Sequence, residues 1–239
     1  GITPANALAV AQKLYLAGLI SYPRTSSQKI PDLKEADKVL KRLGKEYPSL
    51  TKEITRKKPI EGNKSDPAHP AIIPTGTHSN RLTDYDEKIY NLIVKRFISC
   101  YCSDAELENK KINVEVDKLK FNARGMEVKT AGWMKVYPTK MEEKEVRDFN
   151  GEVNIDKIKI EEKETKPPRR FSPASIVTAL EKKNLGTKAT RANIIETLYD
   201  RNYVKDKSIK ATELGIRLID TLKKYSEVII DEKLTREIE

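Results

Sequence analysis

The spacing of apolar residues changes period twice along this 239-residue chain, and this constrains the fold more than any other feature. From residue 1 to about 102, and again from 166, apolar residues recur every three to four positions, as in amphipathic helices. Between 103 and 165 they alternate, as in half-buried strands. A purely helical or purely β architecture is therefore excluded. The pattern predicts a multidomain α+β protein with domains at 1–102, 103–165 and 166–239.

Capping residues and glycines set the predicted ends of the helices in 1–102. Thr3 and Pro4 suit the cap and first position of a helix that Gly18 ends. A second helix is predicted over 32–43, and a third begins after Thr83. The predicted buried stripe of that third helix is Ile89, Ile93, Phe97 and Cys100.

The middle segment is predicted to be part of an antiparallel β arch or barrel, without evident chemistry of its own. The predicted strands are 107–116, 119–123, 127–129, 133–137 and 153–161.

The third segment is predicted to run helix, helix, hairpin, helix. Ser172 and Pro173 start its first helix, which is expected to reach Asn184, and Thr190 caps the second. Helix–turn–helix followed by a β wing is common in nucleic-acid-binding modules. The alternative is a winged fold that serves only for packing.

The net charge of +10 is concentrated at the two ends of the chain. Residues 1–80 carry 13 lysines and arginines against 7 acids, and residues 166–239 carry 16 against 11, while the middle is nearly neutral. A polyanion such as nucleic acid is the natural partner of such ends. The alternative is that the charge serves only solubility.

Several functional classes are excluded by what the sequence lacks. No run of 18 apolar residues could form a membrane span, and Cys100 and Cys102 are too few for a disulfide scaffold or a zinc finger. His69 and His78 lie nine residues apart in a loop region, a spacing that is not a metal-binding pattern. No phosphate-binding P-loop for ATP occurs.

The first motif, residues 18–27, reads GLISYPRTSS. Pro23 disfavours helical geometry for Tyr22, so the tyrosine should leave the preceding helix in an extended conformation. Arg24 lies two residues further and should point to the same side. A guanidinium can grip a phosphate through two hydrogen bonds and favours ionisation of a nearby phenol. The pair therefore suits phosphodiester chemistry; the alternative is a packed ring beside a surface charge.

The second and third motifs add a histidine and a cationic turn. Residues 65–76 read SDPAHPAIIPTG, in which Asp66 could orient His69; the alternative is a purely structural loop. Residues 171–176 read FSPASI and residues 185–195 read LGTKATRANII. Lys188 and Arg191 flank a helix start, where backbone amides attract phosphate. Ordinary capping accounts for Thr190 but not for the two cations.

These three motifs, in this order, resemble the type IA DNA topoisomerases. The first resembles the family's active-site segment A-x-x-L-(Y)-x-x-G-L-I-[ST]-Y-x-R-T, and the second its A-H-x-A-I-x-P-T segment. The third is similar to a long family segment from Ala174 to Val204, and residues 234–239 resemble the start of another. Proline after Tyr22 is most similar to the topoisomerase III and archaeal branches.

The resemblance implies reversible, ATP-independent transesterification on single-stranded DNA through a 5′-phosphotyrosine. Tyr22 would be the nucleophile, Arg24 would hold the scissile phosphate, and His69 would be a supporting group that handles protons. The implied DNA-binding residues are Thr25, Ser172, Ser175, Lys188, Thr190 and Arg191. The resemblance also implies winged-helix-like first and third domains around the β arch.

The chain departs from the whole family pattern, because nothing in it matches the acidic, Mg²⁺-binding toprim domain or the first half of the β arch. We therefore expect a fragment of a larger enzyme that holds no metal or cofactor itself and is inactive alone. The resemblance further implies a monomer with no membrane partner, cytoplasmic and associated with the nucleoid.

Three alternatives remain open. A non-enzymatic winged-helix DNA-binding protein would explain the charge and the third segment but not the first two motifs. A tyrosine recombinase or replication-initiator nuclease would need catalytic residues that the sequence lacks. The chain could also be the topoisomerase part of a reverse gyrase.

Overall fold

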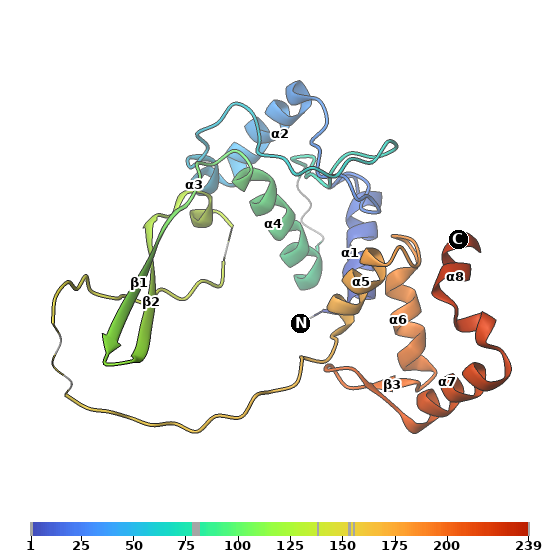
Figure 1. The fold of residues 1–239 in the computed structure, drawn as a ribbon. Helices are drawn as coiled ribbons and strands as arrows, with labels where there is room; N and C mark the ends of the chain where they lie inside the picture. The colour runs from blue at the N-terminus through green and yellow to red at the C-terminus, as the bar shows by residue number, and fades with distance from the viewer. Residues whose placement is uncertain (1, 78–81, 138, 153, 155, 239) are drawn as a thin grey trace. The chain divides into compact units, whose positions relative to one another are not determined.

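The contacts in the computed structural model divide the chain into two compact units. Residues 2–77, 82–137, 139–152, 154 and 156–238 are described, so His78 lies outside the described part. Unit 1 comprises Gly1–Lys29, Asn63–Tyr90 and Lys166–Glu239, and unit 2 comprises Ile30–Gly62 and Asn91–Thr165. Each unit thus combines segments that are distant in sequence (Figure 1). The three domains inferred from hydrophobic period remain a prediction, since compactness of contacts does not test them.

Helix α1, Pro4–Leu16, begins unit 1 as predicted. The Thr3 hydroxyl accepts a hydrogen bond from the Asn6 amide at 3.2 Å, which satisfies one of the unpaired donors at the helix start. Gly18 follows with φ +71°, a left-handed conformation that glycine adopts without a steric penalty. The chain therefore turns out of the helix just before the tyrosine motif.

The C-terminal part of unit 1 has the predicted order of helix, helix, hairpin, helix. Its elements are α5 (Pro173–Lys182), α6 (Arg191–Asp200), β3 (Val204–Lys205), β4 (Lys210–Ala211), α7 (Glu213–Tyr225), the 3-10 turn η2 (Glu227–Ile230) and α8 (Glu232–Ile238). Helix α5 ends two residues before the predicted Asn184, which instead has φ +53° in the turn after the helix. The β3–β4 hairpin is only two residues long on each side.

Unit 2 contains α2 (Leu33–Glu46), α3 (Pro48–Thr51) and most of α4 (Asp84–Ser99), whose first residues belong to unit 1. The buried apolar residues of unit 2 are Ala36, Val39, Leu43, Val94, Phe97, Ile98, Tyr101, Cys102 and Val136. Complete burial of each large member of this set contributes about 1.5–3 kcal/mol to folding.

The buried stripe of α4 differs from the prediction by about one position. Tyr90, Val94, Phe97 and Ile98 are buried, whereas Ile89, Ile93 and Cys100 are only half-buried. Tyr90 can be buried because its hydroxyl donates a hydrogen bond to the Thr77 carbonyl at 3.0 Å. Of the four predicted residues only Phe97 is buried, and the prediction missed Tyr90, Val94 and Ile98 because it followed a stripe one position away from the buried face.

A long antiparallel hairpin forms the β part of unit 2 (Figure 1). Strand β1, Glu106–Val116, pairs with β2, Leu119–Thr130, which replaces the two short strands predicted at 119–123 and 127–129. Gly125 therefore does not interrupt the strand. A Cβ at this position would lie 2.6 Å from the Lys144 carbonyl oxygen, so the glycine permits close approach of a third segment.

Two predicted strands are wrong. Residues 133–137 were expected to be extended, but Gly132–Lys135 forms the 3-10 turn η1, with Gly132 at φ +46° and the Trp133 amide bound to the Ser103 carbonyl. The described residues of 153–161 form no strand, and Ile160 is 88% exposed. An alternating pattern makes a strand only where a partner supplies hydrogen bonds, and none pairs with this segment among the described residues.

No helix in the described ranges combines the length and the apolar character needed to cross a membrane.

Candidate active site

The tyrosine motif and the histidine motif lie side by side within unit 1. The Ser21 amide donates to the Ile73 carbonyl and the Thr75 amide to the Leu19 carbonyl, both at 2.9 Å. The Ser21 hydroxyl adds a bond to the Ala71 carbonyl at 3.0 Å. Backbone pairing of residues 19–21 with residues 73–75 thus joins two motifs that are some fifty residues apart in sequence.

Tyr22 and His69 are in direct contact. Their ring centroids are 4.4 Å apart with the planes tilted by 46°, and the Tyr15 ring of α1 meets Tyr22 edge-on at 5.3 Å. Pro23 is buried behind the tyrosine, whereas Tyr22 and His69 are half-buried and so keep an accessible side. The Thr25 hydroxyl donates to the His69 carbonyl at 3.2 Å, which ties the two loops together beside the rings.

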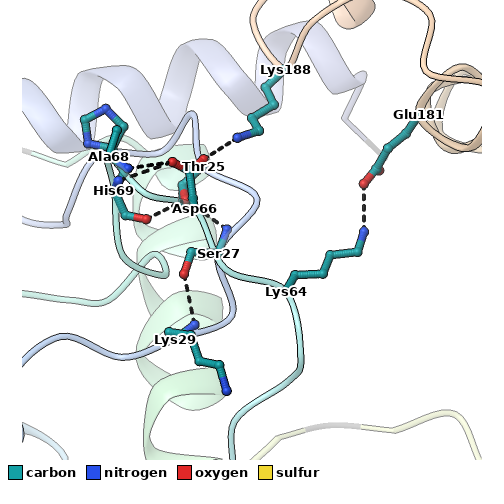
Figure 2. A network of polar contacts seen from close by, with 9 residues as sticks. All are labelled: Thr25, Ser27, Lys29, Lys64, Asp66, Ala68, His69, Glu181 and Lys188. Carbon is teal, nitrogen blue, oxygen red and sulfur yellow. Dashed lines mark hydrogen bonds and ion pairs between the residues drawn. The ribbon is translucent and has the colours of Figure 1, made fainter.

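Asp66 organises the loop that carries His69, but not by the route expected. Its Oδ1 accepts hydrogen bonds from the amides of Ala68 at 3.0 Å and His69 at 3.3 Å (Figure 2). It therefore orients the histidine through the backbone rather than through the ring. Its Oδ2 forms an ion pair with Lys188 from the third motif. Lys188, followed by the two amides, holds the pKa of Asp66 well below its usual range.

The third motif forms a compact turn before α6. The Thr187 amide donates to the Thr190 hydroxyl at 2.8 Å, and Nε of Arg191 donates to the Leu185 carbonyl at 2.8 Å. Gly186 has φ +65°, a left-handed conformation that glycine adopts without a steric penalty.

All three motifs meet at one open pocket of about 660 Å³, which lies wholly within unit 1. Six residues predicted from the sequence line it: Tyr22, Arg24, Thr25, His69, Lys188 and Arg191. Such a pocket combines a phenol, an imidazole and three permanent cations. It can therefore hold an anionic group beside a nucleophilic oxygen.

Three other predicted residues do not line this pocket. Ser172 and Ser175 form a reciprocal cap at the start of α5, in which each side chain binds the other's backbone amide. Thr190 holds its own turn together and makes no side-chain bond to the first amides of α6. Their hydroxyls thus have local structural partners.

Asp66, which was expected to orient His69, also lines the pocket, together with five residues that the sequence reasoning did not assign to a site: Ser26, Glu181, Asn184, Thr187 and Ala189. Thr187 and Ala189 flank Lys188 and could have been found from that motif. Glu181 and Asn184 could not, because they come from the end of α5 and from the following turn, and no local pattern marks them.

Comparison with known proteins identifies the family of the chain that forms this pocket. A protein-family model described as DNA topoisomerase matches residues 1–239, the whole chain. The chain belongs to the DNA topoisomerase family.

Curated members of this family are similar over the full chain. DNA topoisomerase 1 of Methanothermobacter thermautotrophicus is 45% identical, covering 100% of this chain and 34% of that protein. DNA topoisomerase 1 of Pyrococcus horikoshii is 42% identical, covering 100% of this chain and 37% of that protein. The chain thus spans about a third of the length of these curated relatives.

A solved topoisomerase has the same fold. Full-length topoisomerase I from Thermotoga maritima superposes with a TM-score of 0.77 at 25% identity, over 99% of this chain and 42% of that one. The predicted membership in the type IA topoisomerases is therefore confirmed at the level of the family, and the mixed α and β class is confirmed with it.

Magnesium, which the topoisomerase resemblance implies for the whole enzyme, does not fit the residues present. Over the described ranges, no group of three or more histidine, cysteine, aspartate or glutamate side chains could hold a metal ion. Asp66 and Glu181, the acids of the pocket, are each paired with a lysine. No step below is assigned to a metal.

Proposed function

We propose that this chain carries the nucleophilic part of a type IA topoisomerase, which cleaves and rejoins single-stranded DNA. The observation that carries the proposal is the meeting of Tyr22, Arg24 and His69 with Lys188 and Arg191 around one pocket.

The proposed step exchanges one phosphoester for another. The Tyr22 hydroxyl oxygen attacks phosphorus, the bond from phosphorus to the 3′ oxygen breaks, and the 5′ phosphate remains bound to the tyrosine. The phenolic proton leaves and the 3′ oxygen gains one, so charge and atoms balance. Because the bond energy is conserved, the reverse step rejoins the strand without ATP.

The neighbouring side chains would each have a separate part. Arg24 is exposed in the pocket and would hold two oxygens of the scissile phosphate as negative charge develops. His69 lies against the Tyr22 ring, with the ring centroids 4.4 Å apart, and would receive or return the phenolic proton. Lys188 and Arg191 would bind phosphates adjacent to the scissile one.

Several finer expectations belong to this proposal. The helix–helix–hairpin–helix order of 172–225 supports a winged-helix-like DNA-binding domain, and the β1–β2 hairpin supports part of a β arch. Thr25, Ser172, Ser175 and Thr190 would contact the strand in addition to their structural roles. The whole protein would act as a monomer on chromosomal DNA in the nucleoid, with Mg²⁺ bound by residues that this chain does not supply.

The test is covalent capture of DNA by the longer protein that contains this chain. A single-stranded oligonucleotide labelled at its 3′ end should become attached to the wild-type protein when the reaction is stopped with detergent. Tyr22→Phe should abolish the labelled band while retaining DNA binding, because it removes only the attacking oxygen. Tyr15→Phe is the matched control, since it removes a phenol from the adjacent ring.

The outcomes separate the competing functions. Capture by Tyr22→Phe at the wild-type level would refute the assignment, and loss of capture only in Tyr15→Phe would move it to Tyr15. DNA binding without any capture in the wild type would favour the non-enzymatic winged-helix protein. A second oligonucleotide, labelled at its 5′ end, should not be captured, and its capture through a 3′ phosphate would indicate recombinase chemistry.

A further inference from the structure

Two ion pairs of opposite sense join the loop that carries His69 to the third segment of the chain (Figure 2). In one, Lys64 of the histidine loop meets Glu181 of α5 at 2.8 Å. In the other, Asp66 of the same loop meets Lys188 of the turn before α6. Asp66, Glu181 and Lys188 also line the pocket, so the pairs lie where the proposed substrate would bind.

The Asp66 carboxylate is held in place from two sides. Its side chain is 10% exposed, and the amides of Ala68 and His69 fix Oδ1 so that Oδ2 faces the Lys188 ammonium. The Lys188 side chain, by contrast, is 40% exposed. The carboxylate is therefore the fixed partner, and the lysine is the one that can move to another anion.

We propose that Asp66 acts as an internal substitute for a DNA phosphate, so that single-stranded DNA reaches Lys188 only by displacing this carboxylate. The inference rests on the proposed function, because the displacing anion is the phosphate of the bound strand. In this proposal Asp66 lowers the affinity of the pocket for DNA, whereas the cations that line the pocket raise it.

Charge chemistry makes the exchange feasible. Carboxylate and phosphate oxygens both accept charge-assisted hydrogen bonds from an ammonium, which as a compact point charge does not require one fixed geometry. When the pair opens, water can solvate the Lys188 end, which is 40% exposed, and the Asp66 carboxylate keeps its bonds to the two amides. Arg24 and Arg191 line the same pocket and would draw a strand towards it.

The Asp66 carboxylate that competes with DNA is charged at the neutral pH of a binding assay. Lys188 and the loop amides lower the pKa of Asp66, so the carboxylate is ionised at neutral pH and in mild acid. Its effect should therefore depend on salt rather than on pH. Removing its charge should expose one additional cation to the strand.

The test measures binding of a fluorescein-labelled thymidine oligonucleotide of about twenty residues to the full 239-residue chain. Asp66→Asn keeps an oxygen that can accept from the Ala68 and His69 amides but carries no charge. It should lower the Kd roughly three- to tenfold at low salt and steepen the log–log salt dependence by about 0.7, the value for one phosphate on a single strand. Asp66→Ser, whose hydroxyl can also cap the amides, should behave alike if the asparagine variant unfolds.

Glu232→Gln is the matched control. It breaks an exposed lysine–carboxylate pair of the same unit, Lys183–Glu232 at 2.5 Å, and removes the same charge without touching the pocket. It should change the Kd by less than twofold. Equal effects of Asp66→Asn and Glu232→Gln would overturn the proposal, because the gain would then follow net charge alone.

A double-mutant cycle that combines Asp66→Asn with Lys188→Met is the second test of the proposal. With the lysine removed, Asp66→Asn should improve binding no more than the control does. The same gain with and without Lys188 would overturn the proposal. If the wild-type chain binds no oligonucleotide at all, the proposed function fails at its DNA-binding step; if it binds but Asp66→Asn does not tighten it, only this inference fails.

Discussion

At the scale of single residues, substitution of Arg24 tests whether phosphate binding in the pocket requires the planar donor geometry of arginine or only its charge. Lysine retains the charge of arginine but lacks the planar, two-pronged donor arrangement. We expect Arg24→Lys in the longer protein to lower the rate of covalent capture by about 10²-fold, as removal of one preorganised donor does in other enzymes. Capture assays over a time course measure this, with Arg42→Lys on α2 as a control outside the pocket.

Capture by Arg24→Lys at the wild-type rate would show that only the charge matters at this position. A loss of DNA binding equal to the loss of rate would place Arg24 in strand binding rather than at the reacting phosphate.

Tyr101 carries a prediction about stability rather than catalysis. Its hydroxyl oxygen is buried and has no hydrogen-bond partner among the described residues, and burial raises the pKa of its phenol to about 12. Tyr101→Phe removes this unsatisfied group and retains the ring that packs on Phe97. We expect the free energy of unfolding to rise by about 1 kcal/mol. Tyr90→Phe, which removes a hydroxyl that is bonded to Thr77, should lower it by a similar amount.

Chemical denaturation of the two variants measures both changes. A loss of stability in Tyr101→Phe would mean that the hydroxyl has a partner, such as an ordered water.

At this scale the sequence predicts which residues supply the chemistry of the site, but it does not predict which side chains contact one another. Tyr22, Arg24, His69, Lys188 and Arg191 were named from motifs, and the structure brings them to one pocket. The pairing of Asp66 with Lys188 spans 122 positions, and nothing local to either residue indicates it. Such contacts arise from the path of the chain, which hydrophobic period does not encode.

At the scale of elements, the start of α4 is held by a buried acid. Asp86 is 2% exposed, and its carboxylate accepts from the Thr83 amide at 3.0 Å and pairs with Lys13 of α1 at 2.5 Å. The Lys13 bond, followed by the Thr83 amide, lowers the pKa of Asp86. This one residue therefore both caps α4 and ties it to α1.

The lowered pKa of Asp86 determines the direction in which the free energy of unfolding changes with pH. A carboxylate whose pKa is lower in the folded state stabilises the protein above its unfolded pKa, near 3.9, and loses that contribution as the pH falls through the folded value. Asp86→Asn should lower the free energy of unfolding by about 1–3 kcal/mol at pH 7. The difference from wild type should shrink as the pH falls below about 4, where the carboxyl group of the unfolded chain takes up a proton first, and should disappear once the pH has fallen through the lower pKa of the folded protein.

Thermal unfolding between pH 7 and pH 2 measures this prediction. Asp84→Asn is the control, because that acid is exposed in the same helical turn. A gap between Asp86→Asn and wild type that stays constant in acid would contradict the argument.

The elements show why sequence period predicts helices better than strands. The caps predicted at Thr3 and Ser172 are local, and the structure confirms each with a side-chain bond to a nearby amide. The cap predicted at Thr190 is wrong, because its hydroxyl accepts from the Thr187 amide in the preceding turn and makes no bond to the first amides of α6. The strand predicted at 153–161 depended on a partner, and no partner pairs with its described residues. A helix satisfies its own backbone, whereas a strand requires another segment to do so.

At the scale of the whole molecule, the chain should bind single-stranded DNA but should not change DNA topology. Its basic excess lies in residues 1–80 and 166–239, and much of both segments belongs to unit 1 together with the pocket. The described residues offer no acidic metal site, and the chain covers 34% of its Methanothermobacter relative. We therefore expect no relaxation of supercoiled plasmid by the chain alone, with or without Mg²⁺. Tyr22-dependent relaxation by the purified chain would contradict this.

The expected binding of single-stranded DNA can be made quantitative through its dependence on salt concentration. Each phosphate neutralised on a single strand releases counterions, and this lowers the slope of log K against log salt by about 0.7. A strand that contacts Arg24, Arg191 and two to four further cations, about four to six phosphates in all, should give a slope of about −3 to −4. Fluorescence anisotropy across a range of salt concentrations measures it. Arg191→Met should reduce the steepness by about 0.7, whereas Arg42→Met in unit 2 should not change it. A slope near zero would mean that binding does not depend on phosphate contacts, and equal effects of the two substitutions would mean that the strand is not bound at the tyrosine pocket.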